Sequence, residues 1–272
     1  MPRTRLAAAR QGRSLSATMP ARPPRTPAAP FLYGRHAVAA ALANPARRKR
    51  QLLLTAEAEA ELARTVPKPW PLRPERTDAA RLRALLGADA VHQGAALLAE
   101  PLANPPLADL LAAGTGPVLV LDQVTDPRNV GAVLRSAAAF GAACVIVQER
   151  HAPGATGALA RAAAGALERV PMLAEVNLAR ALEILKQAGL WLVGLDGGAR
   201  ATLRGIGLGR RRAALVLGAE GEGLRRNVRA HCDELARLPM LPGAVESLNV
   251  SVAAAVALYE ITVERLEKGE TP

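Results

Sequence analysis

Short runs of apolar residues recur along the C-terminal half of the chain and predict buried strands. The runs cover residues 118–121, 143–147, 190–195 and 213–217. A segment with the pattern of a helix or a turn follows each run. Continuous apolar runs that alternate with helices are typical of a mainly parallel sheet with helices on both faces. We therefore expect an α/β domain over residues 118–268.

Two helices of this domain can be bounded from the sequence. Asp126 is suited to cap the first helix, Pro127 to its first turn and Gly141 to its end. The apolar stripe between these signals consists of Val130, Val133, Leu134 and Ala137. The last helix, over residues 248–267, is apolar on all sides in its first half, so we expect it to be buried against protein.

A smaller unit precedes this domain. Residues 37–42 and 78–86 have the pattern of helices, and residues 51–54 and 95–99 have that of strands. Together they predict a small α/β domain over residues 31–100.

Two segments flank the small domain. Residues 101–117 are rich in proline and predict a linker. Residues 1–30 contain several arginines and no acidic residue. This composition predicts a disordered basic arm that can contact RNA through its phosphates alone.

The charge of the chain narrows the class of partner. With 35 Lys and Arg against 24 Asp and Glu, the 272 residues carry a formal net charge of +11, which favours a polyanion such as nucleic acid. The alternative source of the charge is the Arg- and Ala-rich composition of a GC-rich genome. Aromatic residues make up only 2% of the chain, which argues against recognition of RNA by stacking of bases on an aromatic surface.

The sequence does not indicate a metal site or a membrane span. Cys144 and Cys232 lie far apart and lack the spacing of zinc ligands. No apolar run is long enough to cross a bilayer. We therefore expect no bound metal, no membrane contact and a cytoplasmic location.

Common catalytic motifs are also missing, but one glycine-rich segment follows a predicted strand. The chain has no GxSxG, HExxH or GxxxxGK[ST] pattern. Residues 215–224 contain glycines in the order GxxGxG. A dinucleotide-binding turn requires GxGxxG, so an NAD-binding enzyme is the weakest alternative.

Three segments in one order carry a more specific signal. They are DPRNVGAVLR at 126–135, LGAEGEGL at 217–224 and LPMLPGAVESLNVS at 238–251. These segments closely resemble the three motifs of the SpoU family of S-adenosyl-L-methionine-dependent RNA 2'-O-ribose methyltransferases, within the SPOUT class. The resemblance extends over about residues 120–265.

The resemblance implies a fold, a cofactor and partners. The methyltransferase domain would be a SPOUT α/β-knot, in which the C-terminal segment passes through a preceding loop as a trefoil knot. The cofactor would be S-adenosyl-L-methionine and the enzyme a homodimer. Residues 31–100, with YGRH at 33–36 and VHQG at 91–94, resemble the L30e-like substrate-binding domain of the branch that methylates a guanosine of bacterial 23S rRNA.

The same resemblance implies roles for individual residues. Arg135 would lie at the reaction centre, where it would hold a substrate phosphate and stabilise the developing oxyanion. Asn129, at the start of its helix, would hold the ribose or fix the protein loop there. Glu220 would orient Asn129, Arg135 or the third motif by hydrogen bonds. Ser247 and Asn249 would lie near the methyl group and the target ribose, although Ser247 is equally suited to cap the last helix.

Three further residues are implied for the cofactor. Backbone groups at Gly218, Leu238 and Leu248 would bind its adenine and methionine parts, and glycine at 218 would allow close approach of the ligand. The leucines are equally consistent with core positions. Two other functions remain open, namely a tRNA 2'-O-methyltransferase of the same family and a non-catalytic RNA-binding protein of ribosome assembly.

Overall fold

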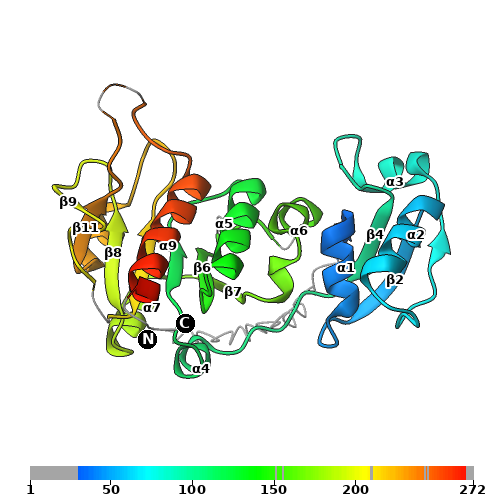
Figure 1. Ribbon diagram of the computed structural model, residues 1–272, viewed down its shortest axis with the longest axis horizontal. Helices are drawn as coiled ribbons and strands as arrows, with labels where there is room; N and C mark the ends of the chain where they lie inside the picture. The colour runs from blue at the N-terminus through cyan, green and yellow to red at the C-terminus, as the bar shows by residue number, and fades with distance from the viewer. Residues whose placement is uncertain are drawn as a thin grey trace, which may run out of the picture.

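The chain forms two α/β domains side by side (Figure 1). The computed structural model describes residues 30–150, 152–154, 156–208, 211–241, 243 and 245–267, the last four of these by their backbone only. The predicted basic arm falls on residues that, apart from Pro30, lie outside this described part.

The N-terminal domain has one mixed sheet in the order β1-β4-β2-β3, with antiparallel ladders except between β2 and β3. Its elements are β1 (Phe31–Tyr33), α1 (Arg35–Ala43), β2 (Lys49–Leu54), α2 (Ala56–Thr65), β3 (Glu75–Arg76), α3 (Ala79–Leu86) and β4 (Ala95–Ala99). The predicted strands and helices of this domain are therefore confirmed to within a few residues. Asp78 caps α3 by accepting a hydrogen bond from the Arg81 N–H at 2.8 Å.

The C-terminal domain is built on a parallel sheet in the order β7-β6-β5-β10-β8-β11-β9. Its elements are α4 (Leu107–Ala113), β5 (Val118–Leu121), α5 (Pro127–Ala139), β6 (Cys144–Gln148), α6 (Gly157–Ala163), η1 (Ala166–Glu168), β7 (Met172–Glu175), α7 (Leu178–Gln187), β8 (Trp191–Leu195), β9 (Ala201–Thr202), β10 (Ala213–Leu217), α8 (Arg226–His231), β11 (Glu234–Arg237) and α9 (Val250–Glu267). All ladders between these strands are parallel. The predicted α/β class and parallel sheet are thus confirmed.

One predicted segment differs from the structure. The proline-rich stretch expected as a linker contains α4, in which Leu107 and Leu111 are buried against the sheet. Pro106 precedes this helix at a position where proline is compatible with helix initiation. The extended connection between the domains is therefore shorter than expected, and α4 packs as part of the C-terminal domain.

The helices α5 and α9 pack against each other on one side of the sheet. The Asp126 side chain caps α5 by accepting from the Arg128 N–H at 2.8 Å, as predicted. Within this single chain, the expected burial of α9 against protein holds for one side of the helix. One side of α9 is buried, but Val252, Val256 and Tyr259 are 46%, 41% and 56% exposed.

A buried carboxylate joins the end of β5 to the segment after β10. Asp122 is fully buried, and it accepts hydrogen bonds from Arg225 through the backbone N–H at 3.0 Å and through Nε at 2.7 Å. The Nη2 atom of Arg225 lies 2.6 Å from the same carboxylate. Since these residues are 103 positions apart, the pair fixes where the chain passes from the glycine-rich turn into α8.

We expect the two partners of this pair to differ in their effect on stability. Arg225→Met leaves a buried carboxylate without its counter-charge, and we expect it to lower the free energy of unfolding of the C-terminal domain by about 3 kcal/mol. Asp122→Asn leaves the Arg225 side chain, which is 38% exposed, able to reach water, and should cost about 1–2 kcal/mol. Urea titration followed by circular dichroism measures both.

Arg204→Met is the control, because Arg204 forms an ion pair with Glu260 while 74% exposed. Its effect should stay within about 0.5 kcal/mol. Equal losses in Arg225→Met and Asp122→Asn would contradict the assignment of the buried charge to Asp122.

Candidate active site

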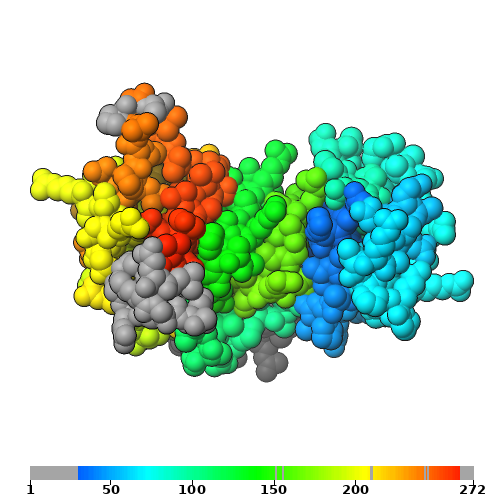
Figure 2. Space-filling model, viewed as in Figure 1, coloured from blue at the N-terminus to red at the C-terminus, as the bar shows by residue number. Residues whose placement is uncertain are grey.

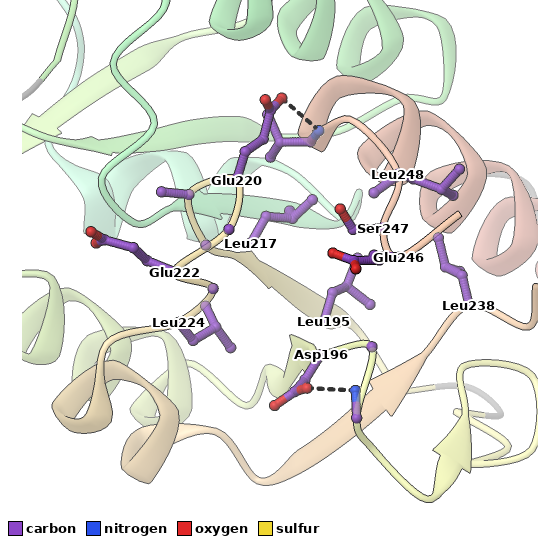
Figure 3. A pocket seen from close by; sticks show the side chains of 18 of the residues that line it. Leu195, Asp196, Leu217, Glu220, Glu222, Leu224, Leu238, Glu246, Ser247 and Leu248 are labelled. Carbon is purple, nitrogen blue, oxygen red and sulfur yellow. Dashed lines mark hydrogen bonds between the residues drawn. The ribbon is translucent and has the colours of Figure 1, made fainter. Parts of the chain in front are cut away.

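A cavity of about 490 Å³ lies at the carboxyl ends of β8 and β10 and beside the segment after β11 (Figure 3). Ligands of open parallel sheets bind at this edge, where strand order changes direction. The volume lies in the range of small-molecule and cofactor sites. Its lining includes Gly218, Leu238, Ser247 and Leu248, so all three predicted cofactor-binding residues face one cavity.

The turn after β10 forms one wall of this cavity and closes on itself. The Gly223 N–H donates to the Ala219 carbonyl at 2.9 Å. A Cβ atom at Gly218 would lie 2.1 Å from the carbonyl group of Gly223. Glycine at 218 is therefore required by the backbone of the turn itself. The sequence-based explanation, close approach of a ligand, was incomplete because it did not include this contact.

A single carboxylate oxygen joins the three sequence motifs. Glu220 Oε1 accepts from Asn249 Nδ2 at 2.5 Å and from Asn129 Nδ2 at 3.2 Å. The Val250 N–H also donates to it at 3.4 Å, and Asn249 Nδ2 donates to Asn129 Oδ1 at 3.1 Å. The structure therefore brings Asn129, Glu220 and Asn249 together at the rim of the cavity, where the Glu220 carboxylate points toward the start of α9 (Figure 3).

Asn249 also begins the last helix. Its Oδ1 accepts from the Ser251 N–H at 3.0 Å and from Ser251 Oγ at 2.6 Å. The capping role that suited Ser247 in the sequence thus belongs to Asn249. Ser247 is exposed and lines the cavity instead.

Arg135 lies apart from this cluster. It is exposed on α5, and it is not one of the residues that line the cavity. Within the part of the chain that the structure describes, no hydrogen bond or ion pair involves its guanidinium. Asn129 and Arg135 are separated by six residues on one helix, a spacing that directs their side chains to different sides. The guanidinium is therefore available to a group outside this chain.

The lining favours a ligand with apolar parts and positive charge. Leu195, Leu238 and Leu248 supply apolar surface, and Asp196, Glu222 and Glu246 supply carboxylates. One cation, Arg229, also lines the cavity, and it already pairs with Asp196 at 2.5 Å. The residues present thus fit S-adenosylmethionine, whose sulfonium and ammonium groups suit the carboxylates and whose flat adenine ring suits the leucine side chains.

The described residues offer neither a metal site nor a membrane-spanning helix. No group of three or more His, Cys, Asp or Glu side chains there is arranged to hold a metal ion. In the same residues, no helix has both the length and the hydropathy needed to cross a membrane.

The pair formed by Asp122 and Arg225 is a feature of the site that sequence analysis missed. Arg225 directly follows the glycine-rich turn, so its bonds to Asp122 hold one end of the cavity wall. Both residues border recognised motifs, but no spacing rule connects positions so far apart in the chain. Only the parallel pairing of β5 with β10 brings them together.

Comparison with known proteins agrees with this geometry. Residues 116–259 match the SpoU rRNA Methylase family, and residues 31–105 match the RNA 2'-O ribose methyltransferase substrate binding family. The first match covers the three motifs, and the second covers the N-terminal domain.

Curated relatives align over most of the chain. The 23S rRNA (guanosine-2'-O-)-methyltransferase RlmB of Xanthomonas campestris is 41% identical over 245 residues, which are 87% of this chain and 97% of that protein. The RlmB protein of Pseudomonas aeruginosa is 42% identical over 246 residues, or 86% of this chain and 96% of that protein.

Solved structures share the fold. The SpoU methyltransferase AviRb from Streptomyces viridochromogenes, in complex with AdoMet, superposes with a TM-score of 0.70 at 24% identity and covers 87% of this chain and 90% of that one. A structure described as an RNA 2'-O ribose methyltransferase gives a TM-score of 0.67 at 28% identity, over 87% of this chain and 88% of the other. From the family match and the relatives, the chain belongs to the SpoU rRNA methylase family.

Proposed function

We propose that this protein transfers a methyl group from S-adenosylmethionine to the ribose 2'-oxygen of a guanosine in bacterial 23S rRNA. The observation that carries the proposal is the hydrogen-bonded cluster of Asn129, Glu220 and Asn249 at the rim of the cavity. The RlmB relatives, at 41% and 42% identity over most of the chain, support this substrate. A ribosomal RNA substrate implies reaction in the cytoplasm.

The reaction needs alignment and an acceptor for one proton. When bound, S-adenosylmethionine would supply a methyl group on a positively charged sulfur, and its neutral thioether would be the leaving group. The ribose 2'-hydroxyl would need to be aligned with that methyl group and would release its proton to solvent. Glu220 fixes the amides of Asn129 and Asn249, so that these two side chains can orient the ribose hydroxyls. Ser247 lines the same cavity, and we place it beside the methyl group.

The glycine-rich turn after β10 exposes backbone groups to the cavity, and such groups can bind the cofactor. Gly218, Leu238 and Leu248 lie on the lining, and we assign the adenine and methionine parts to backbone groups of these three segments. The carboxylates at Asp196, Glu222 and Glu246 favour the positive charges of the cofactor.

Arg135 is assigned to the RNA. Arginine keeps its proton in proteins, so a role as a free base is disfavoured. Its guanidinium can instead bind a phosphate of the RNA with two parallel hydrogen bonds. The exposure of Arg135 and its freedom from bonds to any described side chain support this role.

The alternatives have less support. A tRNA methyltransferase of the same family is disfavoured by the N-terminal domain, which matches a substrate-binding family and accompanies rRNA specificity in the RlmB relatives. A non-catalytic assembly protein does not require the motif residues, yet Asn129, Glu220 and Asn249 are present and hydrogen-bonded. The tRNA alternative stays in view because a Synechocystis relative, 39% identical over 263 residues, has the broader name uncharacterized tRNA/rRNA methyltransferase.

We also propose that the C-terminal segment forms the knot implied by the resemblance. The sheet order supports it, because β10 lies between β5 and β8, and β11 lies between β8 and β9. Late strands are thus inserted between earlier ones, as threading of the chain end through a preceding loop requires.

A homodimer is proposed from α9. Val252, Val256 and Tyr259 repeat at intervals of four and three residues, so they form one exposed apolar stripe on the helix. Phe140, at the end of α5, contacts the Tyr259 ring with their centroids 6.2 Å apart, which extends the surface onto α5. Exposed apolar stripes of this kind mark protein interfaces.

An assay of methyl transfer to 23S rRNA tests the main proposal. We expect purified protein with methyl-labelled S-adenosylmethionine to modify one guanosine of 23S rRNA from cells lacking the gene, located by mapping of ribose methylation. Arg135→Ala should lower the rate at least ~100-fold, the scale for one strong transition-state contact. Cofactor affinity by calorimetry should stay unchanged, because Arg135 lies outside the cavity lining.

Arg135→Lys distinguishes a two-pronged contact from simple charge. Lysine keeps the charge but lacks the planar fork, so it should recover little of the rate. Full activity of Arg135→Ala would remove this residue from the mechanism. Methylation of tRNA with no product on rRNA would overturn the proposed substrate.

The dimer is tested by a single charge on α9. Val256→Asp should convert a dimer to a monomer in sedimentation velocity, because burial of an unpaired carboxylate in an apolar interface is unfavourable. Val176→Asp is the matched control, since Val176 is 68% exposed and lies after β7, away from α9. A parent protein that is monomeric, or a Val256→Asp variant that remains dimeric, would contradict this surface.

A further inference from the structure

The two domains are packed against each other through α6 and η1. The Ala160 side chain of α6 is buried in the same apolar cluster as α1 and β4 of the N-terminal domain. A Cβ atom at Gly157 would lie 2.3 Å from the Tyr33 ring, so this contact requires glycine. In Figure 2 the surfaces of α1 and α6 meet without a gap. The interface is therefore closely packed.

A buried ion pair lies within this interface. Arg47, which follows α1, and Glu168, at the end of η1, have side chains only 2% and 6% exposed. The guanidinium donates to the carboxylate through Nη2 at 2.5 Å and through Nε at 3.2 Å. This two-pronged geometry fixes direction as well as distance.

The remaining polar groups of the pair are also bonded. Arg47 Nη1 donates to the Glu100 carbonyl at 2.8 Å, immediately after β4. Asn44 Nδ2 donates to Glu168 Oε2 at 2.7 Å. The network therefore joins the end of α1, the end of β4 and the end of η1, with each strong donor and acceptor paired.

Such a network is better suited to define geometry than to add stability. Removing two charges from water carries a penalty that their attraction only partly offsets, and well-packed apolar groups often stabilise a fold equally well. Directional bonds, in contrast, are satisfied in one arrangement only. A second polar contact, from Arg161 Nε to the Val91 carbonyl at 2.9 Å, crosses the same interface at its exposed side.

The interface is also continuous with the reaction centre. Leu159 and Ala163 of α6 are buried in one cluster with Val130 and Leu134 of α5. The helix α5 carries Asn129 at its start. Packed side chains thus connect the N-terminal domain to the rim of the cavity through α6 and α5.

We propose that the Arg47–Glu168 pair is a positioning device that holds the N-terminal domain at one orientation to the active site and thereby determines which nucleotide of the bound RNA reaches the cavity. The inference rests on the proposed function, because it takes the N-terminal domain as the part that binds the RNA. An RNA held at two points of a rigid protein presents one ribose to the catalytic groups. A domain on a flexible connection would present several.

The test uses the full-length chain and replaces the pair without leaving a buried charge. Arg47→Met combined with Glu168→Leu keeps apolar volume at both positions, which lets the interface stay packed. Arg204→Met is the control, since it removes one arginine from an exposed ion pair outside the interface. Calorimetry with S-adenosylmethionine and circular dichroism confirm that cofactor affinity and fold are retained.

Domain orientation is measured between spin labels on introduced cysteines. Arg64→Cys on α2 and Arg180→Cys on α7 place one label on an exposed position of each domain. Burial raises the pKa of the Cys144 and Cys232 thiols to about 11, so these native cysteines should react slowly at neutral pH. Labelled chains are mixed with an excess of unlabelled chains, so that in the proposed homodimer nearly every labelled chain has an unlabelled partner. Under this dilution we expect a single narrow distance distribution in the parent protein and in Arg204→Met, and a broad one in the double variant.

Product mapping on 23S rRNA gives the second measurement. The double variant should lose roughly tenfold or more of kcat/KM at the target guanosine, a scale expected for misplacement of a bound substrate, and should gain methylation at neighbouring nucleotides. A broad distribution in the parent, an unchanged distribution in the double variant, or unchanged products despite a broadened distribution would each overturn the proposal. A parent protein inactive on 23S rRNA would instead count against the proposed function, while the distances would still decide whether the pair fixes the domains.

Discussion

The arrangement of the active site depends on one carboxylate oxygen, Glu220 Oε1. It accepts hydrogen bonds from the side chains of Asn129 and Asn249 and from the backbone of Val250. These donors lie at the starts of α5 and α9, whereas Glu220 lies in the turn after β10. Three segments separated by up to about 120 residues therefore share one acceptor, and it orients the two amides that we assign to the ribose.

Two ion pairs that contain a buried carboxylate have related roles, one beside the cavity and one between the domains. Asp122 with Arg225 holds the end of the glycine-rich turn, so it acts on the wall of the cavity. Arg47 with Glu168 lies between the domains. In both pairs the arginine also bonds a second group or uses its backbone N–H, which leaves little freedom in the direction of the contact. Buried charge in this protein is thus concentrated where segments distant in sequence must keep a defined geometry.

Most strands of the sheet follow from local sequence patterns, whereas β11 depends on pairing with strands far away in the sequence. The strands β5 and β10 coincide with apolar runs, because strands buried on both faces need no polar positions. The strand β11, with the sequence ELAR, contains two charged residues and resembles a surface loop. It becomes a strand by pairing between β8 and β9. That pairing depends on residues far away in the sequence.

In the site, too, sequence motifs identify some residues, whereas contacts between distant positions are visible only in the structure. Motif order was sufficient to select Asn129, Glu220 and Asn249, which the structure then brings together. The Asp122–Arg225 contact could not be found in this way, since neither residue alone differs from an ordinary end of a strand or helix. The apolar sequence of α9 is consistent both with a core helix and with a dimer face, because it does not distinguish burial in the chain from an interface between chains.

The distribution of charge separates the two ligands of the proposed reaction. The whole chain has a net charge of +11. Among the described residues, however, the cavity lining contains four carboxylates, of Asp196, Glu220, Glu222 and Glu246, and one cation. Phosphate groups are therefore repelled from the cavity but attracted to the rest of the surface. A cationic cofactor is favoured inside. In the proposed reaction the RNA approaches at the rim, where we assign the neutral amides of Asn129 and Asn249 to the ribose, so that no phosphate has to enter. The same field that attracts the nucleic acid thus limits how far it enters, which leaves the ribose hydroxyl as the group exposed to methyl transfer.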